Sequence, residues 1–196
     1  MRVTTASALA RDLRDGRCDP LDLVDQVFAR IDAVGDNAIF TETLRPRAEA
    51  EARAARERLR SGNPASLLDG VPVAWKDLFD LKGRVTRAGS VVLAANPPAV
   101  QDAALVAAGA RAGLVTVGAL NMTEFAFSGI GLNPHFGTPR NPNGTGPARS
   151  PGGSSSASGV VVAADIVPIA FGTDTGGSIR IPAAFNGVVG YKTSTG

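Results

Sequence analysis

The sequence has almost no cysteine or histidine, and each scarcity excludes a class of chemistry. Among its 196 residues one is cysteine, Cys18, and one is histidine, His135. A single cysteine cannot form an internal disulfide framework or a multi-cysteine metal site, and a single histidine excludes a two-histidine metal site. A histidine-based catalytic triad would have to use His135.

The chain also lacks an excess of one charge and a long hydrophobic run. Twenty Lys and Arg residues face eighteen Asp and Glu residues, and the cations are scattered. Neither a nucleic-acid surface nor a membrane surface is therefore indicated. The apolar stretch 160–171 is interrupted by Asp165 and Pro168, and it is too short to span a bilayer. The N-terminus does not resemble a signal peptide, so we expect a cytoplasmic protein.

The first third of the chain has helical periodicity. Asp19 and Pro20 offer an N-cap and an N1 proline, and apolar residues follow at helical spacing at Leu21, Val24, Val27, Phe28, Ile31 and Val34. A second helix, rich in Ala, Glu and Arg, is predicted from about residue 46 to 60 and stops at Ser-Gly-Asn-Pro. We interpret residues 1–65 as a mainly helical packing segment.

Further along the chain, short apolar runs alternate with helical segments. Strands are predicted at 71–75, 114–120 and 166–171, and helices at 99–112 and 160–164. This alternation predicts an α/β fold with a mixed, largely parallel sheet flanked by helices. Because no linker or internal repeat interrupts the pattern, we expect residues 1–196 to form one domain with its catalytic core in 66–196.

Lys76 follows the apolar run Val-Pro-Val-Ala-Trp, which predicts that a buried strand delivers it. Burial disfavours the ammonium form and lowers the pKa of a lysine, so Lys76 could act as a general base near neutral pH. For this segment alone, a structural salt bridge from Lys76 to Asp77 or Asp80 is the alternative.

Two glycine-rich segments bring serines close to apolar elements. SPGGSSSASG, residues 150–159, places Ser154 and Ser155 after two glycines, and FGTDTGGSIRIP, residues 171–182, places Ser178 after two more. Backbone N–H groups at a helix start converge as in an oxyanion hole. A serine nucleophile needs a base, and the available base here is a lysine. The motifs of a P-loop and of an α/β-hydrolase elbow are both absent.

Taken together, these three segments resemble the amidase signature family. The stretch from Gly152 reads GGSSSASGVVVAADIVPIAFGTDTGGSIRIPAAFNGVVGYK, and its serines at 154 and 178 lie 24 residues apart, the spacing of this family. DGVPVAWKDLFDLKGRVTRAGS and NMTEFAFSGIGLNPHFGTPRNP also resemble family blocks. The resemblance covers about residues 20–196 and implies the amidase signature fold.

The resemblance assigns roles to individual residues. It implies that Ser178 is the nucleophile, that Ser154 is a bridging serine after a cis Gly153–Ser154 bond, and that Lys76 is the terminal base. Protons would pass from Ser178 through Ser154 to Lys76 while an acyl-enzyme forms. The oxyanion would be held by backbone N–H groups of Ser178 itself and of Thr175, Gly176 and Gly177. Supporting roles would fall to Ser155, Asp174 and Arg180. Neither a metal nor an organic cofactor is implied.

These assignments favour an amidase that hydrolyses the C–N bond of a small-molecule carboxamide. One alternative is the A subunit of the glutamyl-tRNA(Gln)/aspartyl-tRNA(Asn) amidotransferase, which works with partner subunits. Because family members are about twice as long, another alternative is an inactive, C-terminally truncated fragment. A phosphate- or nucleotide-binding module built on the Gly153 loop is a third. A homodimer stays open, and no direct nucleic-acid or membrane partner is expected.

Overall fold

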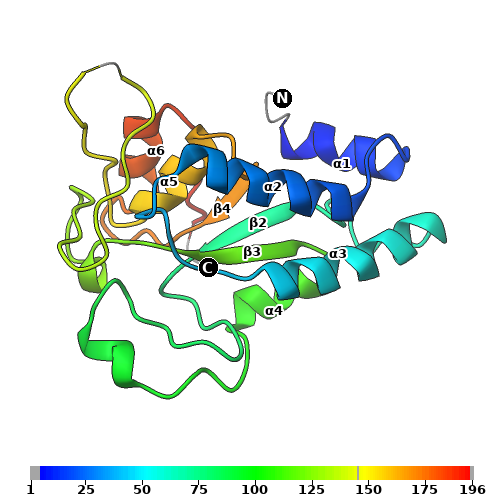
Figure 1. The fold of residues 1–196 in the computed structure, drawn as a ribbon, viewed down its shortest axis with the longest axis horizontal. Coiled ribbons are helices and arrows are strands. Elements are labelled where there is room, and N and C mark those ends of the chain that lie inside the picture. The colour runs from blue at the N-terminus through cyan, green and yellow to red at the C-terminus, as the bar shows by residue number, and fades with distance from the viewer. Residues whose placement is uncertain (1–4, 145, 195–196) are drawn as a thin grey trace.

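The computed structural model, which describes residues 5–144 and 146–194, is built around one mixed sheet of four strands (Figure 1). The strands are β1 (Phe40–Thr43), β2 (Pro72–Lys76), β3 (Val115–Leu120) and β4 (Ile169–Phe171), in the spatial order β1-β3-β2-β4. β2 pairs in parallel with both β3 and β4, whereas β1 pairs antiparallel with β3. The predicted mixed, largely parallel sheet is therefore confirmed.

Helices cover both faces of this sheet. They are α1 (Ala6–Arg14), α2 (Pro20–Val34), α3 (Arg45–Arg60), α4 (Ala104–Arg111), α5 (Ser156–Ala163) and α6 (Arg180–Asn186), with 3-10 turns at Val92–Ala95 and Glu124–Ala126. One buried apolar cluster joins α2, α3 and α5 to Ala74, Val115 and Val117. A second cluster joins α1 and α4 to Val73 and Trp75. The alternation along β2 thus assigns successive side chains to opposite faces.

The two predicted N-terminal helices are confirmed, and their sequence signals explain their ends. α2 begins at Pro20 because the Asp19 carboxylate accepts a hydrogen bond from the Leu21 N–H at 2.8 Å. It ends at Gly35, whose φ of 63° is left-handed and suits glycine. α3 spans the predicted alanine-rich segment and packs Ala48 and Ala52 against the core.

The later elements are present, but their boundaries differ from the prediction. α4 begins at Ala104 rather than near residue 99, because Ala99 exchanges backbone hydrogen bonds with Gly83 and Arg84 instead of starting a helix. α5 begins earlier than predicted, at Ser156, and β4 later, at Ile169. Residues 164–167 fold back onto the end of α5 through hydrogen bonds to carbonyls at 160–162, so they cannot extend the strand.

Two elements, α1 and β1, were not expected. β1 is a strand of only four residues, Phe-Thr-Glu-Thr, and its pairing with β3 brings the N-terminal segment into the central sheet. This shared sheet is why we propose that the two segments form one domain.

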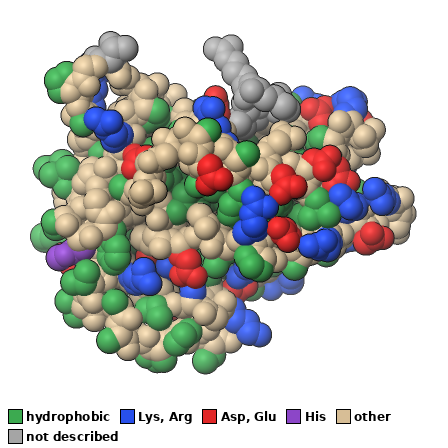
Figure 2. Space-filling model, in the orientation of Figure 1, with side chains coloured by type: hydrophobic (Ala, Val, Ile, Leu, Met, Phe, Trp, Pro, Cys, Tyr) green, Lys and Arg blue, Asp and Glu red, His purple; other side chains and the backbone are tan. Residues whose placement is uncertain are grey.

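The surface divides into a charged side and a more apolar side. In Figure 2, Lys, Arg, Asp and Glu side chains gather over α1, α2 and α3, while hydrophobic side chains are more frequent toward the lower left. Helix α3 shows how the charges are held, since Arg47 pairs with both Glu51 and Asp102. No helix in the described part of the chain is long and apolar enough to cross a membrane.

Candidate active site

The candidate catalytic residues meet where the parallel strands end. Lys76 is the last residue of β2, and the loop that carries Ser178 follows β4, the neighbouring strand. Ser154 precedes α5, which packs against both strands. The carboxyl ends of parallel strands lie at one edge of a sheet, where α/β proteins place their ligand sites. Three segments far apart in the sequence therefore converge here.

Lys76 is fully buried and held by two hydroxyl groups. Its Nζ donates to Ser154 Oγ at 2.7 Å and to Thr173 Oγ1 at 2.8 Å. Burial lowers the pKa of Lys76 from 10.5 to about 8, and the negative charge of Asp174 opposes this change. A useful fraction of Lys76 is therefore neutral near physiological pH, as a general base requires.

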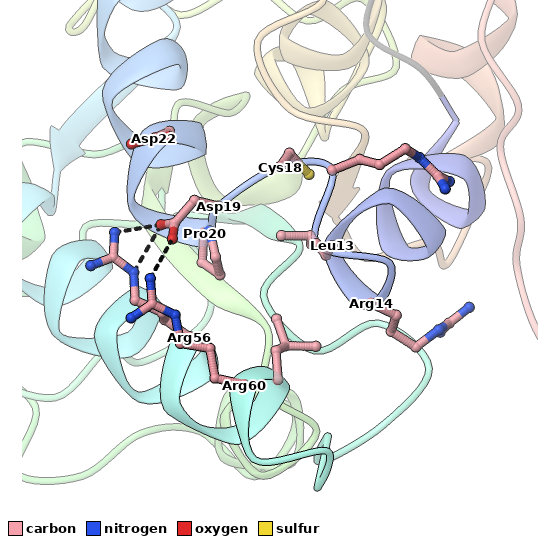
Figure 3. Close-up of a pocket in the computed structure, with 11 residues that line it drawn as sticks. Leu13, Arg14, Cys18, Asp19, Pro20, Asp22, Arg56 and Arg60 are labelled. Carbon is pink, nitrogen blue, oxygen red and sulfur yellow. Dashed lines mark hydrogen bonds and ion pairs between the residues drawn. The ribbon is translucent and has the colours of Figure 1, made fainter.

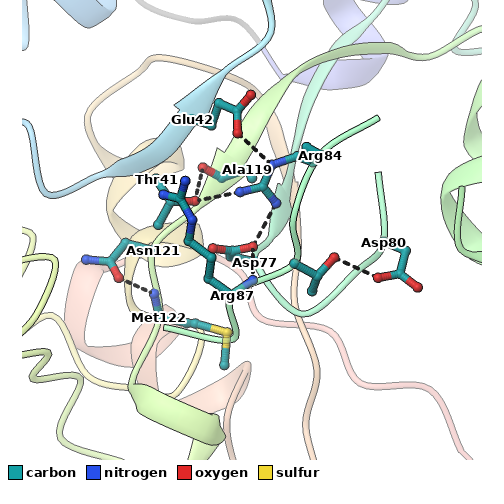
Figure 4. Close-up of polar contacts among 10 residues, drawn as sticks. Thr41, Glu42, Asp77, Asp80, Arg84, Arg87, Ala119, Asn121 and Met122 are labelled. Carbon is teal, nitrogen blue, oxygen red and sulfur yellow. Dashed lines mark hydrogen bonds and ion pairs between the residues drawn. The ribbon is translucent and has the colours of Figure 1, made fainter. Parts of the chain in front are cut away.

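The salt-bridge alternative for Lys76 is wrong for both carboxylates. Asp77 binds Arg84 instead, at 2.7 Å, and Asp80 accepts a hydrogen bond from Thr86 at 2.6 Å (Figure 4). The Asp77–Arg84 pair is buried, and Arg84 also donates to Glu42 on β1. This network fastens the loop after β2 to the edge strand, and among residues 5–144 and 146–194 no carboxylate forms a direct ion pair with Lys76.

Trp75 packs in the core, as predicted, but on the face of the sheet opposite to Lys76. Its ring stacks on Phe171 of β4 with centroids 4.1 Å apart and meets Phe79 edge-on. Its Nε1 donates to Thr116 Oγ1 at 3.2 Å. Trp75 therefore fixes β2 against β4 and so helps to set the position of Lys76 relative to the loop that follows β4.

The Ser154 segment is tightly enclosed. The Gly153–Ser154 peptide bond is cis, as the resemblance implied, and the Ser154 carbonyl accepts the Thr123 N–H at 3.1 Å. A Cβ atom added to Gly153 would lie 2.6 Å from Thr123 Oγ1 and 2.8 Å from the Gly131 backbone. Only glycine fits at 153, and this close packing fixes where the Ser154 hydroxyl lies.

Ser178 contacts Ser155, the residue after Ser154, and within the described residues it makes no hydrogen bond to Ser154 itself. The Ser178 carbonyl accepts the Ser155 N–H at 3.1 Å, which ties the two serine loops together. Ser155 Oγ also donates to the Thr173 carbonyl at 3.3 Å. Ser178 is half-buried, and its hydroxyl makes no hydrogen bond within residues 5–144 and 146–194. The link between Lys76 and Ser154 is therefore formed, whereas the link between Ser154 and Ser178 is open.

Asp174 organises the loop that carries Ser178. Its carboxylate accepts the N–H groups of Gly177 at 2.8 Å, Ile179 at 3.1 Å and Arg180 at 3.2 Å. The Arg180 side chain adds hydrogen bonds from Nε and Nη2. These bonds, that from the Arg180 side chain foremost, hold the pKa of Asp174 well below its usual range. Since the Gly177 N–H is committed to Asp174, it is not available to an oxyanion.

Sequence reasoning missed Thr173, the second hydroxyl on Lys76. The available signal was its place in the block FGTDTGGS, two residues after β4 and next to Asp174. It also missed the buried amides of Asn121 and Asn133. Asn133 Nδ2 donates to the carbonyls of Gly89 and Met122, and so joins the loops that follow β2 and β3.

The other candidate groups lie outside this site. Cys18 lines a separate cavity of about 320 Å³, where Arg56 and Arg60 pair with Asp19 (Figure 3). Burial raises the pKa of the Cys18 thiol, so the nucleophilic thiolate is disfavoured. His135, between β3 and α5, places its Nε2 3.2 Å from Glu124 of the 3-10 turn Glu124–Ala126. Within the described ranges, no three His, Cys, Asp or Glu side chains are grouped to hold a metal.

Comparison with known proteins agrees with this geometry. A family model described as Amidase matches residues 22–196. The chain belongs to the amidase signature family. It is 43% identical over 186 residues to AtzE, a 1-carboxybiuret hydrolase subunit from Pseudomonas sp. (strain ADP), covering 94% of this chain and 40% of that protein. It is also 43% identical over 194 residues to the A subunit of the glutamyl-tRNA(Gln) amidotransferase from Cupriavidus necator, covering 99% of this chain and 38% of that protein.

The fold agrees with solved structures of the family as well. The native peptide amidase from Stenotrophomonas maltophilia superposes with a TM-score of 0.83 and 34% identity, over 93% of this chain and 38% of that one. The chain thus spans about two fifths of the length of the relatives it matches.

A groove of about 810 Å³ follows β4, an edge strand of the described sheet, and reaches Ser155 and Asp174.

Proposed function

We propose that this amidase family member hydrolyses a carboxamide C–N bond through an acyl-enzyme on Ser178. The observation that carries the proposal is the 2.7 Å hydrogen bond between buried Lys76 Nζ and Ser154 Oγ, next to the Ser178 loop. A lysine with a lowered pKa, joined to a serine that neighbours a second serine, is a base with a proton path to a nucleophile.

The first step moves protons toward the lysine. Neutral Lys76 accepts the Ser154 proton, Ser154 accepts the Ser178 proton, and Ser178 Oγ attacks the amide carbonyl. This step requires the unpartnered Ser178 hydroxyl to turn toward Ser154. Such hydrogen bonds are often long or unformed before substrate binds, so the open link is compatible with the relay. Thr173 keeps the Lys76 amine directed at Ser154 through its 2.8 Å hydrogen bond.

The negative charge that develops on the carbonyl oxygen needs donors. We propose that the N–H groups of Thr175, Gly176 and Ser178 supply them, while Gly177 shapes the loop through Asp174. The protons then return along the relay to the leaving nitrogen, which departs as the amine or ammonia, and water hydrolyses the ester on Ser178. The relay needs no metal or organic cofactor, because each proton transfer uses a side chain of the chain itself.

For the substrate and the partners we propose a chemical class and a type of assembly rather than named molecules. We expect a small-molecule carboxamide in the cytoplasm. Two relatives are named as subunits, one of a 1-carboxybiuret hydrolase and one of a glutamyl-tRNA(Gln) amidotransferase. These names support partner subunits for this chain, and the amidotransferase A subunit is our second candidate function. A homodimer is a further possibility for the assembly.

The test is ammonia release from a panel of carboxamides that includes glutamine. We expect Lys76→Ala and Ser154→Ala each to lose most of the activity while the fold, followed by circular dichroism, is kept. Near-normal turnover in Lys76→Ala would overturn the relay. Glutamine hydrolysis that appears only with added amidotransferase subunits would favour the second candidate. An absence of turnover by the folded chain under all conditions would favour the inactive-fragment alternative.

A further inference from the structure

Asp174 is a carboxylate with no access to water. Its side chain is 0% exposed, and its charge is balanced chiefly by Arg180, which is 56% exposed. The contact is bidentate, with Arg180 Nε 3.0 Å from Oδ2 and Nη2 2.9 Å from Oδ1. A guanidinium suits this two-point contact because its donors form a planar fork. Arg180 therefore reaches from the surface to neutralise a buried charge.

This buried charge lies next to the candidate base. Asp174 follows Thr173, whose hydroxyl is bonded to Lys76 Nζ, so one short loop carries both a hydrogen-bond partner of the lysine and the carboxylate. A negative charge near a buried lysine favours the ammonium form, which cannot accept a proton. Burial accordingly lowers the pKa of Lys76, and the charge of Asp174 raises it by a smaller amount.

Among the residues that the structure describes, two other acidic groups on the loops after β2 and β3 have their own partners. Asp77, the next residue after Lys76, is bound to Arg84, and Glu124 in the loop after β3 lies against His135. The Ser154 loop before α5 contributes hydroxyl groups, and α6 contributes Arg180. Asp174 is thus the charge that acts on Lys76, and Arg180 is the chief partner of Asp174.

We propose that Arg180 is a positioning residue for the base: by neutralising Asp174, it leaves Lys76 beside a balanced ion pair rather than a bare carboxylate. This inference rests on the proposed function for its meaning in catalysis. It predicts that the charge of Arg180, more than its shape, adjusts the pH at which Lys76 gives up its proton, on top of the larger effect of burial. Because Arg180 is half exposed, solvent screens part of its charge, and we expect a moderate effect.

The test is a direct titration of Lys76 by NMR in protein labelled with ¹³C at lysine Cε. The chain has three lysines, Lys76, Lys82 and Lys192, so the signals are assigned by replacing the other two with arginine. The wild-type midpoint is expected near pH 8. In Arg180→Gln it should rise by about half a pH unit, the equivalent of a roughly threefold loss of neutral lysine at pH 7. In Arg180→Lys, which keeps the charge, it should stay close to that of the wild type.

Two further variants separate charge from loop damage. Asp174→Asn removes the carboxylate and should move the midpoint of Lys76 in the opposite direction, downward, which a general loosening of the loop would not do. Arg111→Gln, an exposed arginine at the end of α4, is the matched control and should leave the midpoint unchanged. An unchanged midpoint in folded Arg180→Gln, or an upward shift in both Arg180→Gln and Asp174→Asn, would overturn the inference.

A second readout distinguishes this inference from the proposed function. The labelling rate of Ser178 by a fluorophosphonate, measured from pH 6 to 10, should follow the Lys76 midpoint in each variant. A folded wild type that is not labelled at any pH would contradict the proposed function, while the NMR midpoints would still decide the role of Arg180. A labelling rate that falls in Arg180→Gln by the same factor at every pH would assign Arg180 a structural role only.

Discussion

The burial of Lys76 makes a prediction about stability that does not depend on catalysis. Lys76 is 0% exposed, has no direct carboxylate partner in the described part of the chain, and has a pKa lowered from 10.5 to about 8. Between these two values the unfolded chain binds more protons than the folded chain, so the free energy of unfolding must rise with pH across this window. Below pH 8 the full cost of the buried charge is present, and above pH 10.5 it is gone.

The size of the effect follows from the same two numbers. At about 1.4 kcal/mol per pH unit, the difference corresponds to about 3 kcal/mol in the free energy of unfolding. Lys76→Met is neutral at every pH and should lack this dependence. Removing the charge should raise the free energy of unfolding at pH 7 by about 3 kcal/mol. Loss of the hydrogen bonds to Ser154 and Thr173 should lower it by about 1 kcal/mol each. We therefore expect Lys76→Met to be inactive and about 1 kcal/mol more stable at pH 7.

The assay is urea unfolding of both proteins from pH 7 to 10.5, followed by the fluorescence of the single tryptophan, Trp75, which is buried. All other titratable groups are present in both proteins, so their contributions cancel in the difference. Between pH 7 and 10.5 the free energy of unfolding of the wild type should rise by about 3 kcal/mol relative to that of Lys76→Met. A difference that is flat with pH would refute the conclusion that burial perturbs Lys76.

Three other substitutions probe the surroundings of the lysine. Asp77→Ala removes the buried carboxylate bound to Arg84, whose side chain is 2% exposed, and leaves Glu42 as the remaining ionic contact, so it should lower the free energy of unfolding by about 3 kcal/mol in urea. Gly153→Ala places a Cβ 2.6 Å from Thr123 Oγ1, and should displace the Ser154 loop and abolish fluorophosphonate labelling before it unfolds the chain. Ser154→Ala should keep the fold but slow labelling at least a hundredfold, because it interrupts the proton path.

Substitutions at exposed positions serve as controls for these three. Asp15→Ala removes an exposed partner of Arg17 and should change the free energy of unfolding by less than about 0.5 kcal/mol. A similarly small change for Asp77→Ala would contradict the role given to the buried pair. Gly62→Ala, just after α3, adds a Cβ with no atom within 4 Å at a φ of 74°, so its strain stays local and labelling should persist. Wild-type labelling in Gly153→Ala or Ser154→Ala would remove the support for an enclosed relay.

The burial of Lys76 could be predicted because it depends on local sequence. The apolar run before it is too short for a helix and lies among turn residues, so a buried strand is the natural interpretation. The caps of α2 were predictable for the same reason, since Asp19, Pro20 and Gly35 act within one or two residues of themselves. In both cases the sequence signal is local, although the contacts that bury Lys76 come from β3, β4 and the Ser154 segment.

The contacts made by Thr173 and Gly177 could not be predicted in this way. Thr173 meets Lys76 only because β4 pairs beside β2, and strand order is set by packing between segments nearly 100 residues apart. The pattern of glycines indicated several free N–H groups near Ser178, but it did not reveal that Asp174 takes the one at Gly177. Likewise β1, four residues with little apolar alternation, is a strand because β3 offers it an edge.

The central claim is that Lys76 and Ser154 activate Ser178, and its most direct test is the intact mass of the folded chain after reaction with a fluorophosphonate. We predict one adduct, which peptide mapping places on Ser178. The adduct should be absent in Ser178→Ala and strongly reduced in Lys76→Met. Folded wild-type protein that forms no adduct, or that forms it on another residue, would contradict the account.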